Sequence, residues 1–249
     1  MLIYTKHTVS ERISTAMPQQ NQNTNSSAKF PTGKCFIIGA GDFAVTQIPD
    51  YNEETDTLIA VDGGIFYCGL LSLEPDVIIG DFDSVDEEMA TAIALIETNY
   101  PDKVLRLKPE KDDTDMLVAL KWGLAKGFTS FRIYGGLGGR LDHTLANIQC
   151  LLYLKNNGAD GYLLEADGMI MVSATGDVRH FQPSMEGYLS LFSLEKESVV
   201  SIENMKYPLS SYTVTNDFPI GISNEFLPGQ GGTVTVHSGA IAMLLKWPE

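Results

Sequence analysis

Two clusters of aspartates are the residues in this sequence whose types and spacing could do chemistry. The first lies in Ile79-Gly-Asp-Phe-Asp-Ser84, where Asp81 and Asp83 directly follow a short apolar run. Carboxylates this close repel one another unless a cation lies between them. If the backbone stays extended, residues two apart point to the same side, so Asp81 and Asp83 could bind one ion. The cluster therefore predicts a site for a hard metal ion such as Mg²⁺, and with it phosphate chemistry.

The second cluster, Lys111-Asp-Asp-Thr-Asp115, opens a segment with helical spacing of apolar residues. Asp112 and Asp115 are three apart and share a face of the first turn, whereas Asp113 points elsewhere and is interpreted as a solvated charge. Mg²⁺ usually takes one or two carboxylates, together with water and substrate phosphates, which suits this supply. The alternative is ordinary structure, because aspartates also cap helices and form turns after strands.

Two glycine segments, Asp62-Gly-Gly64 and Gly135-Gly-Leu-Gly-Gly-Arg140, each follow a strand-like run and precede a helix. Glycines at such turns allow backbone N–H groups to approach phosphate oxygens. Arg140 adds a planar, permanently charged group that binds phosphate well. These segments predict a nucleotide site, and the alternative is a tight turn with Arg140 in solvent. Asp142 and His143 come next, and they could contribute to the site or simply cap the helix.

The segment Gly39-Ala-Gly-Asp-Phe-Ala44 supports a rival function of a different class. It fits the G-x-G-x-x-A pattern of dinucleotide-binding folds, and Asp62 follows Gly41 by 21 residues. A nicotinamide-dependent oxidoreductase would use such a pattern. The match is weak, because Pro49 leaves room for only a short helix after the glycines. Hydride transfer would also leave the pair of aspartates at 81 and 83 without a role.

The elements that must position these residues form an α/β pattern in the first part of the chain. Short apolar runs alternate with segments of helical spacing, which predicts a Rossmann-like, mostly parallel sheet covered on both faces. We assign residues 33–166 to this nucleotide-binding, catalytic domain. The predicted strands are Cys35–Ile38, Thr57–Val61, Val77–Ile79, Val104–Leu107, Phe131–Tyr134 and Tyr162–Leu164.

The pattern changes after about Glu165, where turn residues rather than helices separate the apolar runs. This predicts an all-β sandwich or barrel over residues 167–249. At the other end, residues 1–32 are polar and include a Gln/Asn/Ser/Thr-rich tract. We predict that they form a disordered extension outside the fold.

Composition limits the function classes that need to be considered. The formal net charge of −15 over 249 residues argues against a nucleic-acid surface, which needs a basic patch. No apolar stretch reaches the roughly 18–20 residues that span a bilayer, and the N-terminus lacks the apolar core of a signal peptide.

The three cysteines, Cys35, Cys68 and Cys150, form no C-x-x-C pair. They are expected to be buried thiols in a protein of the reducing cytoplasm.

Taken in order, six segments of the chain resemble the thiamine pyrophosphokinase (thiamine diphosphokinase) family. The resemblance extends from about Lys34 to Lys246, and its specificity comes from six motifs in the right order across both halves. The segments are Ala60-Val-Asp-Gly-Gly64, Gly80-Asp-Phe-Asp-Ser84, Lys111-Asp-Asp-Thr-Asp115, Gly135-Gly-Leu-Gly-Gly-Arg-Leu-Asp-His143, Asn204-Met-Lys-Tyr-Pro-Leu209 and Gly221-Ile-Ser-Asn-Glu-Phe226.

The resemblance implies transfer of diphosphate from ATP to the hydroxyethyl oxygen of thiamine, leaving AMP, with Mg²⁺ as cofactor. It also implies a homodimer with active sites at the interface, and a β domain that binds thiamine and forms the dimer. The implied catalytic residues are Asp81, Asp83, Asp115, Arg140 and Asp142, and the implied metal ligands are Asp81, Asp83 and Asp115, with Asp112 in or beside the shell. The implied nucleotide contacts are Asp62, Gly63, Gly64, Lys111, Arg140 and His143. The implied thiamine contacts are Tyr207, Ser223 and Asn224.

One position departs from the family pattern. Animal members have Trp where this chain has Tyr207, and an aromatic ring there can still stack on a flat cationic heterocycle, although Trp is the stronger cation–π partner. Tyr207 could also be an ordinary turn residue.

Two further functions stay open beside the oxidoreductase: a pterin-type pyrophosphokinase, which moves diphosphate to a hydroxymethyl group, and a module that binds ligand without catalysis.

Overall fold

The structure is a computed structural model that describes residues 33–43, 45–110 and 112–248. The predicted extension over residues 1–32, and Lys111 with its expected nucleotide contact, lie outside the described residues. The chain forms two compact units that meet in sequence at Glu165 and Ala166, with the short segment Ile48–Asp50 grouped with the second. They are called here the α/β unit and the β unit.

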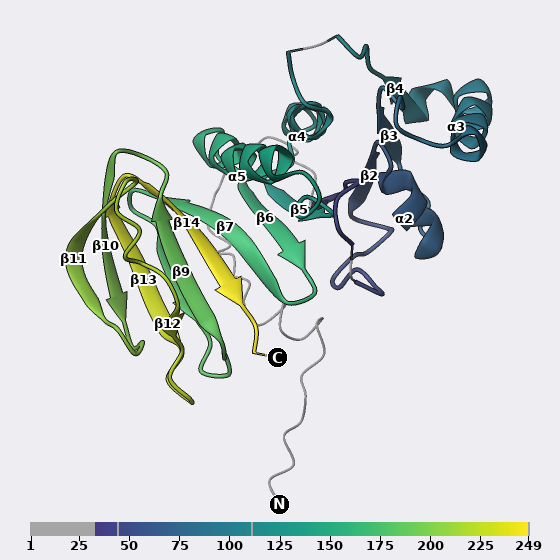
Figure 1. The fold of residues 1–249 in the computed structure, drawn as a ribbon. Helices are drawn as coiled ribbons and strands as arrows, with labels where there is room; N and C mark the ends of the chain where they lie inside the picture. Colours follow the sequence, from purple (N-terminus) through teal and green to yellow (C-terminus); the bar gives the residue numbers. More distant parts are fainter. Residues whose placement is uncertain (1–32, 44, 111, 249) are drawn as a thin grey trace, which may run out of the picture. The chain divides into compact units, whose positions relative to one another are not determined.

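The α/β unit is built on a sheet of parallel strands (Figure 1). Their order across the unit is β6-β5-β1-β2-β3-β4, and each neighbouring pair is parallel. Strands β1 and β3 are buried at every position, as expected for strands covered on both faces. The predicted apolar runs coincide closely with these strands. Their bounds are β1 (Cys35–Ile38), β2 (Thr57–Val61), β3 (Val77–Gly80), β4 (Val104–Arg106), β5 (Ser130–Tyr134) and β6 (Asp160–Glu165).

Helices cover both faces of this sheet. Figure 1 shows α4 and α5 on one side of strands β1 to β3, and α2 and α3 on the other. Two helices begin at side-chain caps: the Thr114 hydroxyl accepts from the Leu117 N–H at 3.2 Å, and the Asp86 carboxylate accepts from the Met89 N–H at 2.8 Å. The Thr114 cap sets the start of α4 at Asp115, within the second predicted carboxylate cluster. The bounds are α2 (Gly64–Leu70), α3 (Glu87–Asn99), the 3₁₀ turn η1 (Pro101–Lys103), α4 (Asp115–Ala125) and α5 (Leu141–Asn156).

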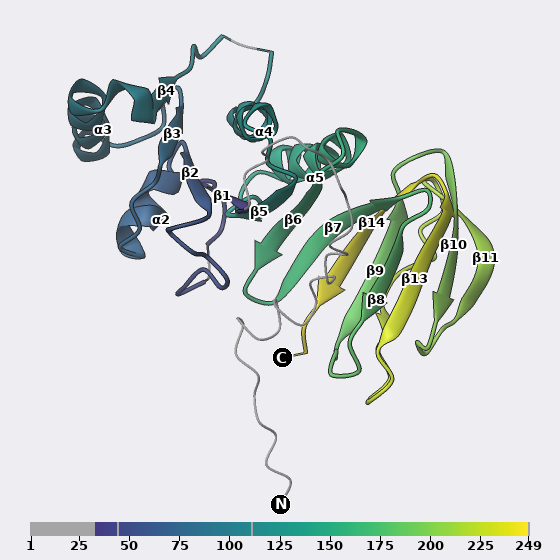
Figure 2. The same cartoon turned by 180° about the vertical axis from the view of Figure 1, so that it is seen from behind.

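The β unit consists of two antiparallel layers, seen from behind in Figure 2. One layer has the strand order β12-β9-β14-β7 and the other β11-β10-β13-β8. Pairing within both is antiparallel. The bounds are β7 (Gly168–Ala174), β8 (Val178–Phe181), β9 (Tyr188–Ser193), β10 (Glu197–Glu203), β11 (Leu209–Thr215), β12 (Asn224–Glu225), β13 (Gly232–Ser238) and β14 (Ala240–Lys246).

The core of the β unit follows from the alternation of its strands. Along β10, Val200 and Ile202 are fully buried while the residues between and beside them are half-buried or exposed, which is the period of a strand with one covered face. Phe181 from β8 and Phe226, next to β12, meet edge to face with ring centroids 5.3 Å apart. The predicted fold class, an α/β domain with a mostly parallel sheet followed by an antiparallel β sandwich, is confirmed.

The three cysteines are buried free thiols, as predicted. Burial raises the pKa of Cys68 to about 12 and that of Cys150 to about 11, and it raises the pKa of Cys35 further still. Thiols in such surroundings stay protonated and unreactive near neutral pH. No helix in the described part of the chain has the length and apolar character that crossing a bilayer requires.

Candidate active site

Three aspartates from separate segments converge in the α/β unit. Asp62 directly follows β2, Asp81 directly follows β3, and Asp115 is the first residue of α4. One carboxylate oxygen from each lies within 4.8 Å of those of the other two, and all three residues are half-buried. Because β2 and β3 are parallel neighbours, their carboxyl ends deliver side chains to the same edge of the sheet. This is the cluster of described residues that could hold a metal ion.

The cluster differs in membership from the set predicted for the metal. Asp62 was assigned to the nucleotide, yet its carboxylate lies in the metal-competent cluster. The signal that could have identified it was available in the sequence, because Asp62 follows β2 just as Asp81 follows β3. Asp83 and Asp112 are exposed and are not part of the cluster among the described residues. Their roles as metal ligands stay predictions.

Phe82 interrupts the extended backbone between Asp81 and Asp83. Phe82 has φ 60°, in the left-handed region, so the backbone between the two aspartates is not extended. The condition under which Asp81 and Asp83 would share a side is therefore not met. Instead, the Asp83 N–H donates to Oδ1 of Asp81 at 3.3 Å.

Asp113 behaves as an ordinary charge at a helix start. Asp113 precedes α4, and its carboxylate is paired with the ammonium of Lys121 in that helix at 2.5 Å, in partial contact with solvent. An exposed pair of this kind contributes little to stability. The interpretation of Asp113 as a residue outside the metal site agrees with this arrangement.

A cavity of about 400 Å³ lies next to the aspartate cluster. Asp62 and Asp115 form part of its wall, so a cation held there would also face the cavity. Most of the remaining lining comes from two glycine-rich turns and the first turns of α5, which is the composition expected for a phosphate-bearing ligand. The lining residues include Gly39, Ala40, Gly41, Ser84, Thr114, Gly135, Gly136, Gly138, Gly139, Arg140, His143 and Asn147.

The two glycine-rich turns are joined by their backbones. The Gly39 N–H donates to the Tyr134 carbonyl at 2.8 Å, the Gly41 N–H to the Gly135 carbonyl at 2.8 Å, and the Asp42 N–H to the Leu137 carbonyl at 2.9 Å. A dinucleotide fingerprint needs such N–H groups free for the pyrophosphate. Their use inside the protein argues against the oxidoreductase function, and no helix starts among the described residues directly after Gly41.

The second glycine turn leaves room for a ligand. Gly135, Gly138 and Gly139 all have positive φ, between 58° and 76°, which side-chain-bearing residues adopt at a cost. The turn is held by Asn147, whose buried side-chain amide donates to the Gly136 carbonyl at 2.6 Å. The turn therefore has a fixed shape before any ligand binds. Asn147 has no role in the sequence-based predictions, and its position about two helical turns after Arg140 is the signal that could have identified it.

Arg140 and Asp142 form an exposed ion pair at the start of α5. Nη2 of Arg140 donates to Oδ2 of Asp142 at 2.6 Å, and Nε donates to Oδ1 at 3.1 Å. This side-chain hydrogen bond from Arg140 lowers the pKa of Asp142 and raises the pKa of Arg140. As long as the pair is closed, Asp142 is a weak base.

The predicted thiamine contacts lie in the β unit. The Tyr207 side chain is 55% exposed, so its ring is accessible. Ser223 is exposed, has φ 57°, and its N–H donates to Oγ of Ser190 at 3.0 Å. Asn224 is only 6% exposed, which makes it a poor surface for a ligand.

The Asn224 side chain is engaged with its own unit. Its Oδ1 accepts from the Tyr207 N–H at 2.9 Å and from the Glu225 N–H at 2.9 Å, and its Nδ2 donates to the Tyr207 carbonyl at 2.8 Å. Asn224 therefore fixes the backbone of Tyr207 from both sides. Lys206, paired with Glu225 at 2.6 Å, lies 5.5 Å from the centroid of the Tyr207 ring, so this ring already attracts a cation.

Comparison with known proteins agrees with the geometry of both units. Residues 48–163 match the family model for the catalytic domain of thiamin pyrophosphokinase, and residues 178–241 match the model for its vitamin B1 binding domain. The two ranges together cover well over half of the chain.

Individual relatives match along most of the chain. A thiamine pyrophosphokinase from Bacillus subtilis is 29% identical over 212 residues, which is 84% of this chain and 95% of the relative. Thiamin pyrophosphokinase 1 from Caenorhabditis elegans is 28% identical over 167 residues, covering 63% and 64% of the two chains. The crystal structure of a Bacillus subtilis thiamine pyrophosphokinase superposes with a TM-score of 0.74 at 27% identity, covering 88% of this chain and all of that one.

Proposed function

Because the chain belongs to the thiamine pyrophosphokinase family of ATP-dependent enzymes, we propose that its α/β unit transfers diphosphate from ATP to thiamine at the Asp62–Asp81–Asp115 cluster. The observation that carries this assignment is the convergence of three carboxylates beside a cavity lined by glycine turns and Arg140. Negative oxygen ligands, a cavity for phosphates and a cation to neutralise them are the parts that phosphoryl transfer needs.

The three carboxylates fit Mg²⁺. Mg²⁺ prefers oxygen ligands, and carboxylates are its usual protein ligands. The carboxylate oxygens of the cluster lie within 4.8 Å of one another, close enough for one ion to be held among them. Asp62, Asp81 and Asp115 would hold the ion, and Asp83 and Asp112 would act from outside or through water. When bound, the ion supplies positive charge to the phosphate oxygens.

Arg140 and Asp142 then have linked roles in the reaction. The hydroxyl oxygen of thiamine forms a bond to the β-phosphorus of ATP, the bond from that phosphorus to the oxygen bridging the α-phosphorus breaks, and AMP leaves with that oxygen. Arg140 moves from Asp142 to the phosphates, which a guanidinium also binds in a bidentate manner. Asp142, released from its ion pair, becomes more basic and is the group that would accept the hydroxyl proton. Lys111 and His143 remain predicted contacts of the nucleotide, together with Gly63 and Gly64.

Thiamine recognition is assigned to the β unit. The exposed ring of Tyr207 stacks on the cationic heterocycle, and Ser223 offers a hydroxyl at the surface. Asn224 contributes by holding the Tyr207 backbone rather than by touching thiamine.

In keeping with the family resemblance, we propose a homodimer with active sites at its interface, which sedimentation would test. We also propose the cytoplasm as its location, supported by the free buried thiols.

One assay tests the activity against its alternatives. The protein is incubated with ATP, Mg²⁺ and thiamine, and thiamine diphosphate and AMP are measured by chromatography. Equal amounts of both products are expected. A hydroxymethyl pterin replaces thiamine in a parallel reaction, and pterin diphosphate in its place would identify the pterin-type enzyme. Thiamine binding without AMP formation would identify a non-catalytic module.

A further inference from the structure

Phe82 lies at the centre of the loop that carries Asp81. Its ring is buried, with 8% of the residue exposed, although both of its neighbours in sequence are aspartates. It also adopts φ 60°, a conformation that a bulky residue keeps only where its surroundings hold it. The ring packs closely over Gly80, since a Cβ built on Gly80 would lie 3.0 Å from Cε1 of Phe82. Phe82 therefore anchors the loop through its buried ring.

Arg106 covers the same ring. The guanidinium carbon of Arg106, the last residue of β4, lies 5.0 Å from the Phe82 ring centroid. Because β4 pairs with β3 and Gly80 is the register partner of Arg106, the covering residue is fixed directly beside the loop. A cation at this distance from an aromatic face is attracted to it. The ring is thus in contact with Arg106 and close to Gly80.

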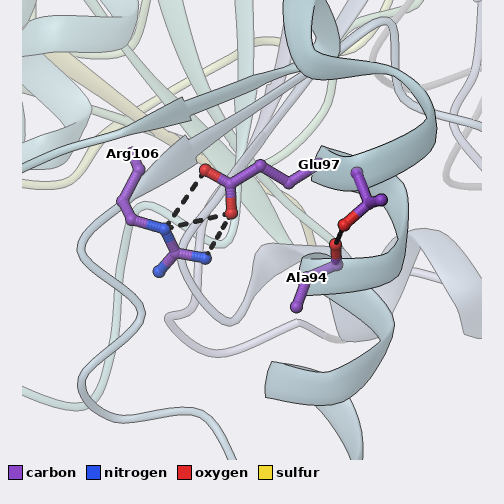
Figure 3. A network of polar contacts seen from close by, with 4 residues as sticks. Ala94, Glu97 and Arg106 are labelled. Atoms are coloured by element: carbon purple, nitrogen blue, oxygen red, sulfur yellow. Dashed lines mark hydrogen bonds and ion pairs between the residues drawn. The ribbon is translucent and has the colours of Figure 1, made fainter.

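Glu97 on α3 fixes Arg106 in turn. Its carboxylate accepts from Nη2 of Arg106 at 2.8 Å and from Nε at 3.2 Å and 3.3 Å (Figure 3). A forked arrangement of this kind sets the plane of the guanidinium as well as its place. Glu97, Arg106 and Phe82 form a continuous series of contacts from α3 to the loop of Asp81.

We propose that Arg106 is a positioning residue for the metal-binding loop: held by Glu97, it clamps Phe82 and so keeps Asp81 aligned with Asp62 and Asp115. This inference rests on the proposed Mg²⁺ site. It gives a role to three residues to which the reaction itself assigns none.

Arg106→Met tests the proposal because positioning and simple electrostatics predict opposite signs. Removing a positive charge near a cation site strengthens cation binding if charge alone matters. Loss of the clamp instead weakens binding by about two- to fivefold, the factor that a cation–π contact of this exposure provides. Mn²⁺ and Mg²⁺ affinity is measured by titration calorimetry on the nucleotide-free protein, so the readout does not depend on turnover.

Lys103→Met is the matched control. Lys103 immediately precedes β4, pairs with Glu74 at 2.6 Å and lies over Tyr100 rather than Phe82. It is expected to leave cation affinity unchanged. Arg106→Lys, which keeps the charge over the ring but loses the fork, is expected to fall between the parent and Arg106→Met.

A double-mutant cycle with Phe82→Leu completes the test. If Arg106 acts through the ring, Arg106→Met has little further effect on cation affinity once Phe82 is replaced. Unchanged or tighter binding in Arg106→Met, with a parent that binds Mn²⁺ normally, overturns the positioning role and leaves the metal site intact. A parent protein that binds neither ion overturns the metal site and the positioning role together.

Discussion

Oδ1 of Asp62 occupies the space beside Gly80 where any other residue would carry its Cβ. A Cβ built at position 80 would lie 2.1 Å from that oxygen, far inside contact distance. The lack of a side chain at the end of β3 therefore allows the carboxylate that follows β2 to reach the cluster. Gly80 is part of the site although it offers no ligand atom.

Gly80→Ala is expected to displace the Asp62 carboxylate and weaken Mn²⁺ binding about tenfold or more, because forcing an extra methyl into a filled space costs about 1–3 kcal/mol. Titration calorimetry measures the change. Gly69→Ala is the control, since a Cβ at Gly69 in α2 meets no atom within 4 Å. It should leave binding unchanged, and equal affinities in the two variants would contradict the packing argument.

Substituting the aspartates one at a time separates the two possible ligand sets. Asp62→Asn, Asp81→Asn and Asp115→Asn should each lower kcat/KM by about a hundredfold or more, because each removes a charge from the ion. Asp83→Asn and Asp112→Asn should each cost about tenfold, at the lower end of the range for residues that act on a metal through water.

Asp113→Asn is the control in this series because it loses only the exposed pair with Lys121, and its activity should match the parent. The decisive comparison is between positions 62 and 83. A larger loss in Asp83→Asn than in Asp62→Asn would restore the ligand set predicted from sequence.

The ion pair of Arg140 and Asp142 predicts a change in titration. Arg140 lowers the pKa of the Asp142 carboxyl below its ordinary value of 3.8, so Arg140→Gln should raise it toward that value. Carboxyl-carbon NMR of the folded protein follows the titration. The same upward shift is expected when a non-hydrolysable ATP analogue draws Arg140 away.

The linkage to stability has a defined direction. A carboxyl whose pKa is lowered on folding stabilises the native state above its unfolded value, and this contribution fades as the pH falls through the folded value. The window therefore lies below about pH 4. An Asp142 pKa that does not respond to Arg140→Gln would contradict the linked roles of the two residues.

Asn224→Ala is expected to raise the KM for thiamine by about fivefold or more while leaving the KM for ATP unchanged, because it frees the backbone of Tyr207. Loss of buried hydrogen bonds of this kind costs about 1–3 kcal/mol, so melting temperature is measured alongside the kinetics. A lower melting temperature and a lower apparent kcat, with both KM values unchanged, would indicate general unfolding instead.

Tyr207→Ala should raise the KM for thiamine, and Tyr207→Trp should keep or lower it, because Trp is the stronger cation–π partner. Tyr212→Ala is the matched control, since Tyr212 is an exposed tyrosine of the same unit. Its kinetics should equal those of the parent. An unchanged thiamine KM in Tyr207→Ala would remove Tyr207 from the substrate site.

Much of the fold could be predicted from the sequence because it depends on local patterns. The apolar runs of β1 to β6 are short and bounded by turn residues, a pattern that predicts strands buried on both faces. The family resemblance likewise depends on motifs in order. Even the pairing of Asp62 with Asp81 was implicit, since both residues directly follow parallel strands.

Other features depend on contacts that no local pattern records. The positive φ of Phe82 breaks the extended backbone between Asp81 and Asp83, and the Phe82 ring lies close to both Gly80 and Arg106. The N–H groups of Gly39 and Gly41 are used by a turn almost a hundred residues later in the chain.

The sequence by itself determined the elements, the family and the kinds of groups at the site. Which carboxylates meet, and whether Asn224 faces a ligand or its own backbone, was decided only by the tertiary structure. The physical reason is that side-chain direction is set by individual backbone dihedrals and by partners distant in sequence, whereas burial and periodicity act along the chain.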